Sequence, residues 1–396
     1  MRRSSGQQVL TLHLGTSLYI YQERKAYPKH IVEINGIRVM ELNEALVRIP
    51  ERFFQTHTAD AVIALRMLRD PTMLLEVLLE NGHSVIAGRL EGAFRHIGDH
   101  ITADRIHSSM RNAGYDVREI NPFITPLSGT FSLSRPSSPY IPRLQGMWAD
   151  MRADVDKLFP SPPGIALNSG VYLTRLDEKY VQDAYHSLSI EGYQVTPELI
   201  EKIRLGLWDP KNNPHDQATI DTMAARGYFE AFQLVKASVR EIIQAADAIC
   251  VVRRAHHEWH QALFSPTVQA GLTSPSILAG YRRSSVFIRG SRHVPLPDHA
   301  LSDAMDTFFE LLSHETHPAV RAVLGHFMFV FIHPYSDGNG RMGRFLMNTM
   351  LASGGYPWTI IHLENRTEYL ETLEEASVNR NIQPFAAYVL SEMNIA

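Results

Sequence analysis

Residues 333–344, with the sequence His-Pro-Tyr-Ser-Asp-Gly-Asn-Gly-Arg-Met-Gly-Arg, decide how this chain is organised. They follow a strongly apolar run, residues 323–332, that is typical of a buried helix. Pro334 disfavours the α conformation at His333, so we expect the helix to end there. The glycines of the stretch permit a tight turn, and a second helix is expected to begin near Gly340.

The same stretch carries the side chains of a phosphate-handling site. A glycine-containing loop that leads into a helix offers unpaired N–H groups and the positive end of the helix dipole, which suit a phosphate. His333 supplies an imidazole that can act as a base at neutral pH, and Asp337 supplies a carboxylate for a hard cation such as Mg²⁺. Arg341 and Arg344 supply guanidinium groups for phosphate oxygens. This inventory is typical of phosphoryl or nucleotidyl transfer.

Residues 333–344 resemble the motif of the Fic family, H-x-F-x-[DE]-G-N-G-R-x-x-R, whose members use ATP to attach AMP to hydroxyl side chains of proteins. Chance produces such a match with a frequency of roughly 10⁻⁹ per start position. Tyr335 replaces the usual Phe, and it should keep the packing role if its hydroxyl finds a partner. The matching positions are His333, Asp337, Gly338, Asn339, Gly340, Arg341 and Arg344.

The resemblance implies a role for each part of the loop. His333 would take the proton from a Ser, Thr or Tyr hydroxyl that attacks the α-phosphorus of ATP, and Asp337 would hold Mg²⁺ between the α and β groups. Asn339 would orient the α-phosphate, Arg341 would neutralise the β-phosphate and Arg344 would bind the γ-phosphate. The residues assigned to ATP by this likeness are Gly338, Asn339, Gly340, Arg341, Met342, Gly343 and Arg344.

Two further segments resemble parts of the family. Residues 366–379 are similar to the helix that lines the adenosine pocket, and this likeness adds Ser377 and Asn379 to the ATP-binding candidates. Residues 284–294 alternate around Gly290, which predicts a short β-hairpin. This hairpin resembles the family's flap, whose edge pairs with the backbone of the target protein. By that likeness Ile288 and Arg289 would face the target.

A second motif lies upstream. Ser187-Leu188-Ser189-Ile190-Glu191-Gly192 resembles the family's inhibitory motif, [ST]-x-x-x-E-[GN]. Ser187 and Glu191 are four residues apart and share a helical face, and Gly192 stands where a helix C-cap would. The helix dipole disfavours a carboxylate at this end, so Glu191 should seek a cation. In the family that cation is the second arginine of the motif, here Arg344, so the resemblance implies an enzyme inhibited within its own chain.

Composition limits the class of protein. The chain has 396 residues and a net charge of −4, which argues against a protein that coats nucleic acid over its whole surface. The single cysteine, Cys250, excludes an internal disulfide and is expected to be a core thiol in a reducing compartment. The longest apolar run is shorter than the ~20 residues that span a bilayer. We therefore expect a cytoplasmic chain without a membrane segment.

The predicted fold is mainly α, a Fic-type helical core with a short β-hairpin flap, plus a small N-terminal α+β or helical domain. Residues 1–124 form that N-terminal domain, beginning with a β-hairpin at Asn35-Gly36. Residues 125–144 are a Ser/Pro-rich connector. Residues 145–396 form the Fic domain, with the inhibitory helix around residues 176–191. Helical patterns cover residues 59–114, 145–158, 176–191, 197–207, 216–246, 248–264, 298–313, 318–332, 340–352, 366–378 and 384–392.

Other readings of the sequence remain open. His256 and His260 have the spacing of a zinc helix, but Glu258 has the wrong offset for H-E-x-x-H, so we interpret them as ordinary helix residues. The same site could transfer another nucleotide, or remove AMP with Glu191 aligning a water. A regulator that binds DNA through residues 1–124 and senses nucleotides through its core is the alternative of another class. The expected partner is a hydroxyl-bearing target protein, while self-modification and a homo-oligomer are left open.

Overall fold

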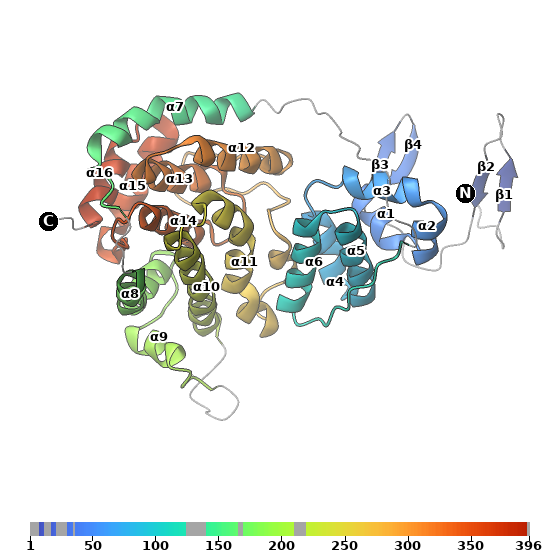
Figure 1. The fold of residues 1–396 in the computed structure, drawn as a ribbon, viewed down its shortest axis with the longest axis horizontal. Coiled ribbons are helices and arrows are strands. Elements are labelled where there is room, and N and C mark those ends of the chain that lie inside the picture. Colours follow the sequence, from blue (N-terminus) through green and yellow to red (C-terminus); the bar gives the residue numbers. More distant parts are fainter. Residues whose placement is uncertain are drawn as a thin grey trace.

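The computed structural model describes residues 8–11, 17–20, 30–34, 36–123, 140–164, 169–209 and 219–393. The fold is mainly helical, as predicted (Figure 1). Two antiparallel hairpins pair β1 with β2 and β3 with β4. The strands are β1 (Gln8–Thr11), β2 (Ser17–Ile20), β3 (Ile31–Ile34) and β4 (Ile37–Met40).

Helices of the N-terminal part are α1 (Leu42–Arg48), α2 (Glu51–Thr56), α3 (Thr58–Met67), α4 (Thr72–Glu80), α5 (Ser84–His96) and α6 (His100–Asn112). The larger part contains α7 (Tyr140–Leu158), α8 (Ser169–Ile190), α9 (Pro197–Arg204), α10 (Ile220–Ile243), α11 (Ala248–Gln269), α12 (Leu301–His314), α13 (Pro318–Ile332), α14 (Asn339–Ser353), α15 (Arg366–Asn379) and α16 (Gln383–Glu392). Short 3-10 turns are η2 (Pro275–Ala279), η3 (Asp298–Ala300) and η4 (Leu363–Asn365).

The hairpin predicted at Asn35-Gly36 is confirmed on both sides of the turn. Ile34 pairs with Ile37 and Val32 pairs with Val39. Gly36 has a φ of 80°, a left-handed value that glycine adopts without strain. Asn35 itself lies outside the described residues.

Two helical bodies lie side by side and share a polar interface. In Figure 1, α1–α6 form the smaller body, and α6 lies at its border with α11 of the larger one. Asn112 on α6 donates to Gln261 on α11 over 3.0 Å, and Arg105 donates to the carbonyl oxygen of Ala279 over 3.2 Å. Ser109 on α6 donates to the carbonyl oxygen of Leu278 over 3.2 Å. These bonds orient the smaller body against α11, the helix that also supports the loop before α14.

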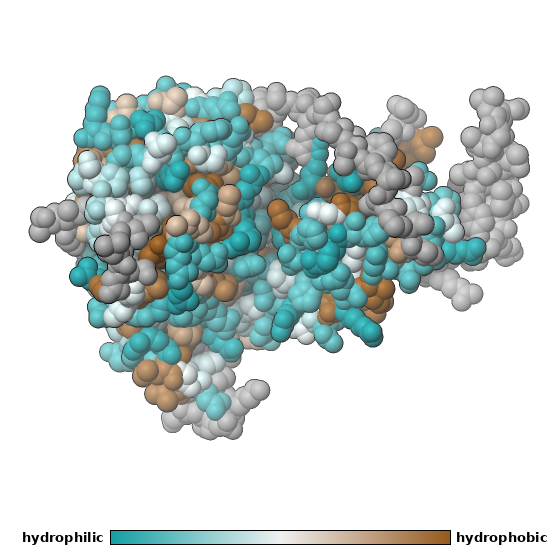
Figure 2. Space-filling view, viewed as in Figure 1, coloured by the Kyte–Doolittle hydropathy of each residue, from teal (hydrophilic) through white to brown (hydrophobic). Residues whose placement is uncertain are grey.

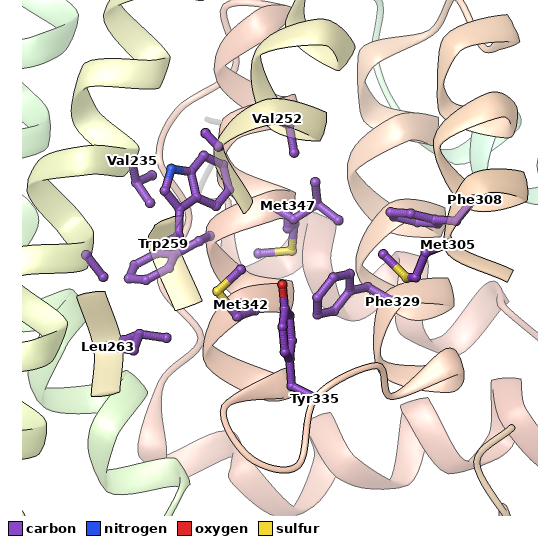
Figure 3. Packing of buried hydrophobic residues seen from close by; sticks show 14 of the residues in the cluster. Val235, Val252, Trp259, Leu263, Met305, Phe308, Phe329, Tyr335, Met342 and Met347 are labelled. Carbon is purple, nitrogen blue, oxygen red and sulfur yellow. The ribbon is translucent and has the colours of Figure 1, made fainter. Parts of the chain in front are cut away.

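The core of the larger body is built around α13 and α14. Both helices are buried on nearly every side, which explains the continuous apolar run that precedes residue 333. Figure 3 shows side chains from both helices and the intervening loop, among them Phe329, Tyr335 and Met342, packed with Trp259 of α11. By contrast, hydrophilic residues cover most of the face shown in Figure 2. None of the helices in the described ranges is long and apolar enough to span a membrane.

Three expectations need correction. Helix α7 begins at Tyr140, so it overlaps the predicted connector at residues 140–144, while residues 125–139 lie outside the described ranges. Pro142 fits in the first turn because no helical partner exists there for the N–H that proline lacks. Cys250 is exposed in the first turn of α11 rather than buried in the core. The arms of the predicted hairpin at residues 284–294 turn at Gly290 but form no strand pairs.

Gly227 lets the backbones of α10 and α11 pack close together. A Cβ atom at this position would lie 2.0 Å from the carbonyl oxygen of Leu263. We predict that Gly227→Ala lowers the free energy of unfolding by about 1–3 kcal/mol, because the two helices must separate. Urea unfolding followed by circular dichroism measures this change.

The matched control is Gly146→Ala on the exposed side of α7, where the added Cβ meets nothing within 4 Å. Helix propensity alone should make this variant more stable by about 0.5–1 kcal/mol. Equal stabilities of the two variants would contradict the close packing inferred at Gly227.

Candidate active site

The loop between α13 and α14 is held by residues with left-handed backbones and by one buried amide. His333 closes α13 with a φ of 55°, and Gly338 precedes α14 with a φ of 84°. The side chain of Asn339 accepts from the Tyr335 N–H over 2.9 Å and donates to the Tyr335 carbonyl oxygen over 2.8 Å. The Asn339 amide therefore fixes the shape of the loop through the backbone of Tyr335.

The imidazole of His333 is arranged as a base. Its Nδ1 lies 3.2 Å from the carbonyl oxygen of Val330, an acceptor that requires a proton on this nitrogen. The lone pair is consequently on Nε2. Burial lowers the pKa of His333 to about 4, so the ring is neutral at pH 7.

Two histidines of α11 contact the loop between α13 and α14. The Tyr335 hydroxyl lies 2.9 Å from Nδ1 of His257, and the His260 ring stacks on the Tyr335 ring at 3.7 Å. Nε2 of His260 also lies 3.1 Å from the carbonyl oxygen of Asp337. The hydroxyl of Tyr335, which stands in place of the usual Phe, therefore has the hydrogen-bond partner that it needs when buried. No role was predicted for these histidines, because their contacts depend on how α11 packs.

The carboxylate of Glu191 covers the beginning of α14. A Cβ atom on Gly340 would lie 2.2 Å from Oε1 of Glu191, so a larger residue at this position would have to displace the carboxylate. The first-turn N–H groups of a helix have no partner within their own helix and attract anions. An acidic side chain therefore occupies the place where the sequence predicts an anion-binding site.

Arg344 joins the two predicted motifs. Its Nε donates to the Ser187 hydroxyl over 2.9 Å, and its Nη2 donates to the Ser187 carbonyl oxygen over 3.0 Å and to Oε1 of Glu191 over 2.7 Å. Gly192 ends the helix with a φ of 94°, as a C-cap residue should. Arg366 donates to the carbonyl oxygen of Ile190 over 2.8 Å and fixes the same helix end. The predicted pairing of Glu191 with Arg344 is present in the structure.

The guanidinium group of Arg341 is buried, and some of its N–H donors have no hydrogen-bond partner. Its guanidinium lies between Tyr193 and Phe264, 5.0 Å from each ring centroid. Nη2 lies 3.3 Å from Oδ1 of Asp337. Within the described residues, Nε and Nη1 of Arg341 and Nη1 of Arg344 are buried without a hydrogen-bond partner. Buried, unpaired N–H donors are costly, and an anion would satisfy them.

Arg282, a buried arginine that the motifs did not identify, connects the predicted flap to the end of α13. Its side chain donates to the carbonyl oxygens of His333 and Ser284, each over 2.8 Å, and also to that of Leu296. At the far end of the flap, Glu374 accepts from the Arg292 N–H over 2.8 Å. These bonds replace the strand ladder expected there. Only the structure reveals the partners of Arg282.

Other predicted residues lie further from this chemistry. Met342 packs in the core, and Gly343 packs against His326, so only their backbones face the loop. Ser377 donates to a carbonyl oxygen of its own helix, and Asn379 is exposed beside Glu375. Ile288 is half-buried and Arg289 is exposed on the flap.

Comparison with known proteins identifies this helical core. Residues 253–351 match the model of the Fic/DOC family. The chain contains a Fic domain. A relative named protein adenylyltransferase Fic, from Nematostella vectensis, is 32% identical over 238 residues, which cover 59% of this chain and 51% of that protein. The protein of the same name from Aedes aegypti is 32% identical over 219 residues, which cover 54% of this chain and 40% of that protein.

The chain therefore spans about half the length, or less, of the curated relatives it matches. A solved structure of a Fic-1 fragment from C. elegans is similar with a TM-score of 0.45 and 18% identity, over 85% of this chain and 94% of that chain.

The protonation state of the Fic-domain histidine can be tested directly. Because burial lowers the pKa of His333 to about 4, its ring should stay neutral as the pH falls from 8 to 5. Nuclear magnetic resonance of ¹³C-labelled histidine measures this, and the His333→Ala variant assigns the resonance. We expect the chemical shift to stay constant over this range. A titration centred near pH 6.5 would contradict the buried, neutral base.

Proposed function

We propose that this chain transfers AMP from ATP to a Ser, Thr or Tyr hydroxyl of a target protein. The observation that carries the proposal is the neutral imidazole of His333 next to the anion-attracting start of α14. A base and a phosphate site in one loop are what attack of a hydroxyl on a phosphate requires. The matched relatives carry the name protein adenylyltransferase, which supports the same reaction.

The residues around the loop provide places for the phosphates of ATP. The first turn of α14 offers N–H groups for one phosphate. The unpaired donors of Arg341 would bind a neighbouring phosphate. Arg344 would hold the terminal phosphate once Glu191 leaves it. Met342, Gly343 and Asn339 would act through the backbone and the loop shape rather than through their side chains.

Asp337 fits a Mg²⁺ ion that is shared with the substrate. The side chain of Asp337 is 57% exposed. Its Oδ1 accepts from the Gly338 N–H and from Nη2 of Arg341. Within the described ranges no group of three or more His, Cys, Asp or Glu side chains could hold a metal by itself. A Mg²⁺ ion at Asp337 would need phosphate oxygens and water to complete its shell, and it would offset charge on those phosphates.

The reaction would proceed by in-line displacement. Nε2 of His333 takes the proton as the hydroxyl oxygen forms a bond to the α-phosphorus. The bond from that phosphorus to the bridging oxygen of the β-phosphate breaks, and pyrophosphate leaves. Arg282 keeps the His333 carbonyl and the flap in place but has no contact with the reacting atoms, so it is a positioning residue. Catalysis of this kind depends mainly on positioning and on charge stabilisation.

Glu191 would keep the enzyme inactive by competing with ATP for one cation. Its carboxylate occupies the guanidinium of Arg344 and the space over Gly340. ATP would then bind with its terminal phosphate displaced, in a pose unsuited to attack on the α-phosphorus. Release of Glu191 would make both the guanidinium of Arg344 and the space over Gly340 available to ATP.

We predict that Glu191→Gly raises the transfer of α-labelled AMP to protein by about tenfold or more, because Arg344 becomes available to ATP. Adding His333→Ala to that variant should abolish transfer. Labelling of a cell lysate with α-³²P-ATP, read after gel electrophoresis, measures both effects. Equal labelling by the wild-type chain and Glu191→Gly would refute the inhibition by Glu191.

The alternatives for the same site give different results in a matched assay. Stronger labelling with α-³²P-UTP or α-³²P-GTP than with ATP would identify another nucleotide as the substrate. Loss of AMP from a previously labelled protein with the wild-type chain, but not with Glu191→Ala, would identify AMP removal as the activity.

A further inference from the structure

A short stretch of backbone, residues 279–282, connects the smaller helical body to the end of α13. We call it the connecting segment. Its residues are buried except for Gly280, which is half-buried. Its first residue is bonded to α6, which lies beside α11 in Figure 1, and its last residue is bonded to His333 and Pro334. The position of the candidate base therefore depends on how this segment is held.

Arg105 of α6 holds the first end of the connecting segment. Its Nη2 donates to the carbonyl oxygen of Ala279 over 3.2 Å, and its Nη1 lies 3.5 Å from Oδ1 of Asp70. The same oxygen of Asp70 accepts from the Thr72 N–H over 3.1 Å and from the Thr72 hydroxyl over 2.7 Å. The guanidinium is thus oriented by the smaller body, and it offers a donor to the segment.

Gly280 brings the connecting segment into direct contact with that guanidinium. The residue has a φ of 136°, in the region that favours glycine. A Cβ atom here would overlap Nη2 of Arg105 and lie 2.7 Å from Oγ1 of Thr72. Both neighbours belong to the smaller body, so a side chain at this position would have to displace them.

Tyr281, in the middle of the segment, packs behind the loop between α13 and α14. Nδ1 of His256 lies 2.9 Å from the carbonyl oxygen of Arg253 and must carry a proton, so Nε2 accepts from the Tyr281 hydroxyl over 2.9 Å. Burial, and then the charge of Arg105, lower the pKa of His256 to about 3, which keeps this acceptor at pH 7. The centroids of the Tyr281 and Tyr335 rings are 5.5 Å apart.

Arg282, at the last end of the segment, holds the backbone of the base. Its N–H donates to the carbonyl oxygen of Pro334 and its Nε donates to that of His333, each over 2.8 Å. His333 has a left-handed φ of 55°, which a residue other than glycine keeps only when its surroundings impose it. A shift of the segment would therefore let this backbone relax and turn the imidazole.

We propose that Arg105 is a positioning residue for His333, acting from the smaller body through residues 279–282. Its hydrogen bonds go to Asp70 and Ala279 and not to residues 338–344, which the proposed function assigns to ATP. Misplacement of a base slows the chemical step without weakening substrate binding. This inference rests on the proposed function, and it gives the smaller body a part in the reaction.

The test compares Arg105→Gln with Arg111→Gln, an exposed arginine on the same helix, both made in the Glu191→Gly chain. Transfer of labelled AMP to lysate protein is measured at a fixed lysate concentration over a range of ATP concentrations. Arg105→Gln should lower the apparent kcat about tenfold and leave the KM for ATP within about twofold, whereas Arg111→Gln should change neither. Arg105→Lys keeps the charge and should lower kcat only about two- to threefold, and it serves if the glutamine variant does not fold.

A second measurement does not depend on AMP transfer. The His333 resonance of ¹³C-labelled histidine at pH 7 should shift in Arg105→Gln and stay in place in Arg111→Gln. An unchanged resonance would overturn the proposal, as would an unchanged kcat or a raised KM at constant kcat. A shifted resonance in a Glu191→Gly chain that transfers no AMP would refute only the proposed function.

Discussion

The guanidinium of Arg344 is the constraint on which the proposed control of this molecule depends. It is buried, so it must have a charged or polar partner in every state of the site. In the structure Ser187 and Glu191 supply that partner, and the pair fixes the end of α8 over the beginning of α14. A phosphate could replace the carboxylate with little change in charge. The inhibited and the active states would then be two ways of satisfying one cation.

The loop between α13 and α14 is hydrogen-bonded from several directions. Asn339 binds both backbone groups of Tyr335, and His257 and His260 contact the ring and hydroxyl of that residue. Arg282 holds the carbonyl oxygen of His333 from the side of the flap. Hydrogen bonds from several elements restrict the positions that the loop and its imidazole can adopt. Among the described residues, Nε and Nη1 of Arg341, Nη1 of Arg344 and Nδ1 of His260 remain buried without a partner.

The sequence predicted the parts of the fold that depend on local pattern. Apolar periodicity located α13 at residues 318–332, and Asn35-Gly36 located the β3–β4 hairpin. The pairing of Glu191 with Arg344 followed from two motifs together. Contacts that depend on tertiary packing were missed, such as the bond between Arg282 and the carbonyl oxygen of His333. The motif also did not show that the Asn339 amide binds both backbone groups of Tyr335, because that contact depends on the loop conformation.

Titration calorimetry of ATP and AMP with the wild-type chain and Glu191→Gln tests the central claim most directly. Both nucleotides carry adenosine and an α-phosphate, but only ATP carries a terminal phosphate that would compete with Glu191 for Arg344. The account predicts that Glu191→Gln tightens ATP binding by about tenfold while the affinity for AMP stays the same. If ATP and AMP gain affinity equally, or if neither does, the competition for Arg344 is contradicted.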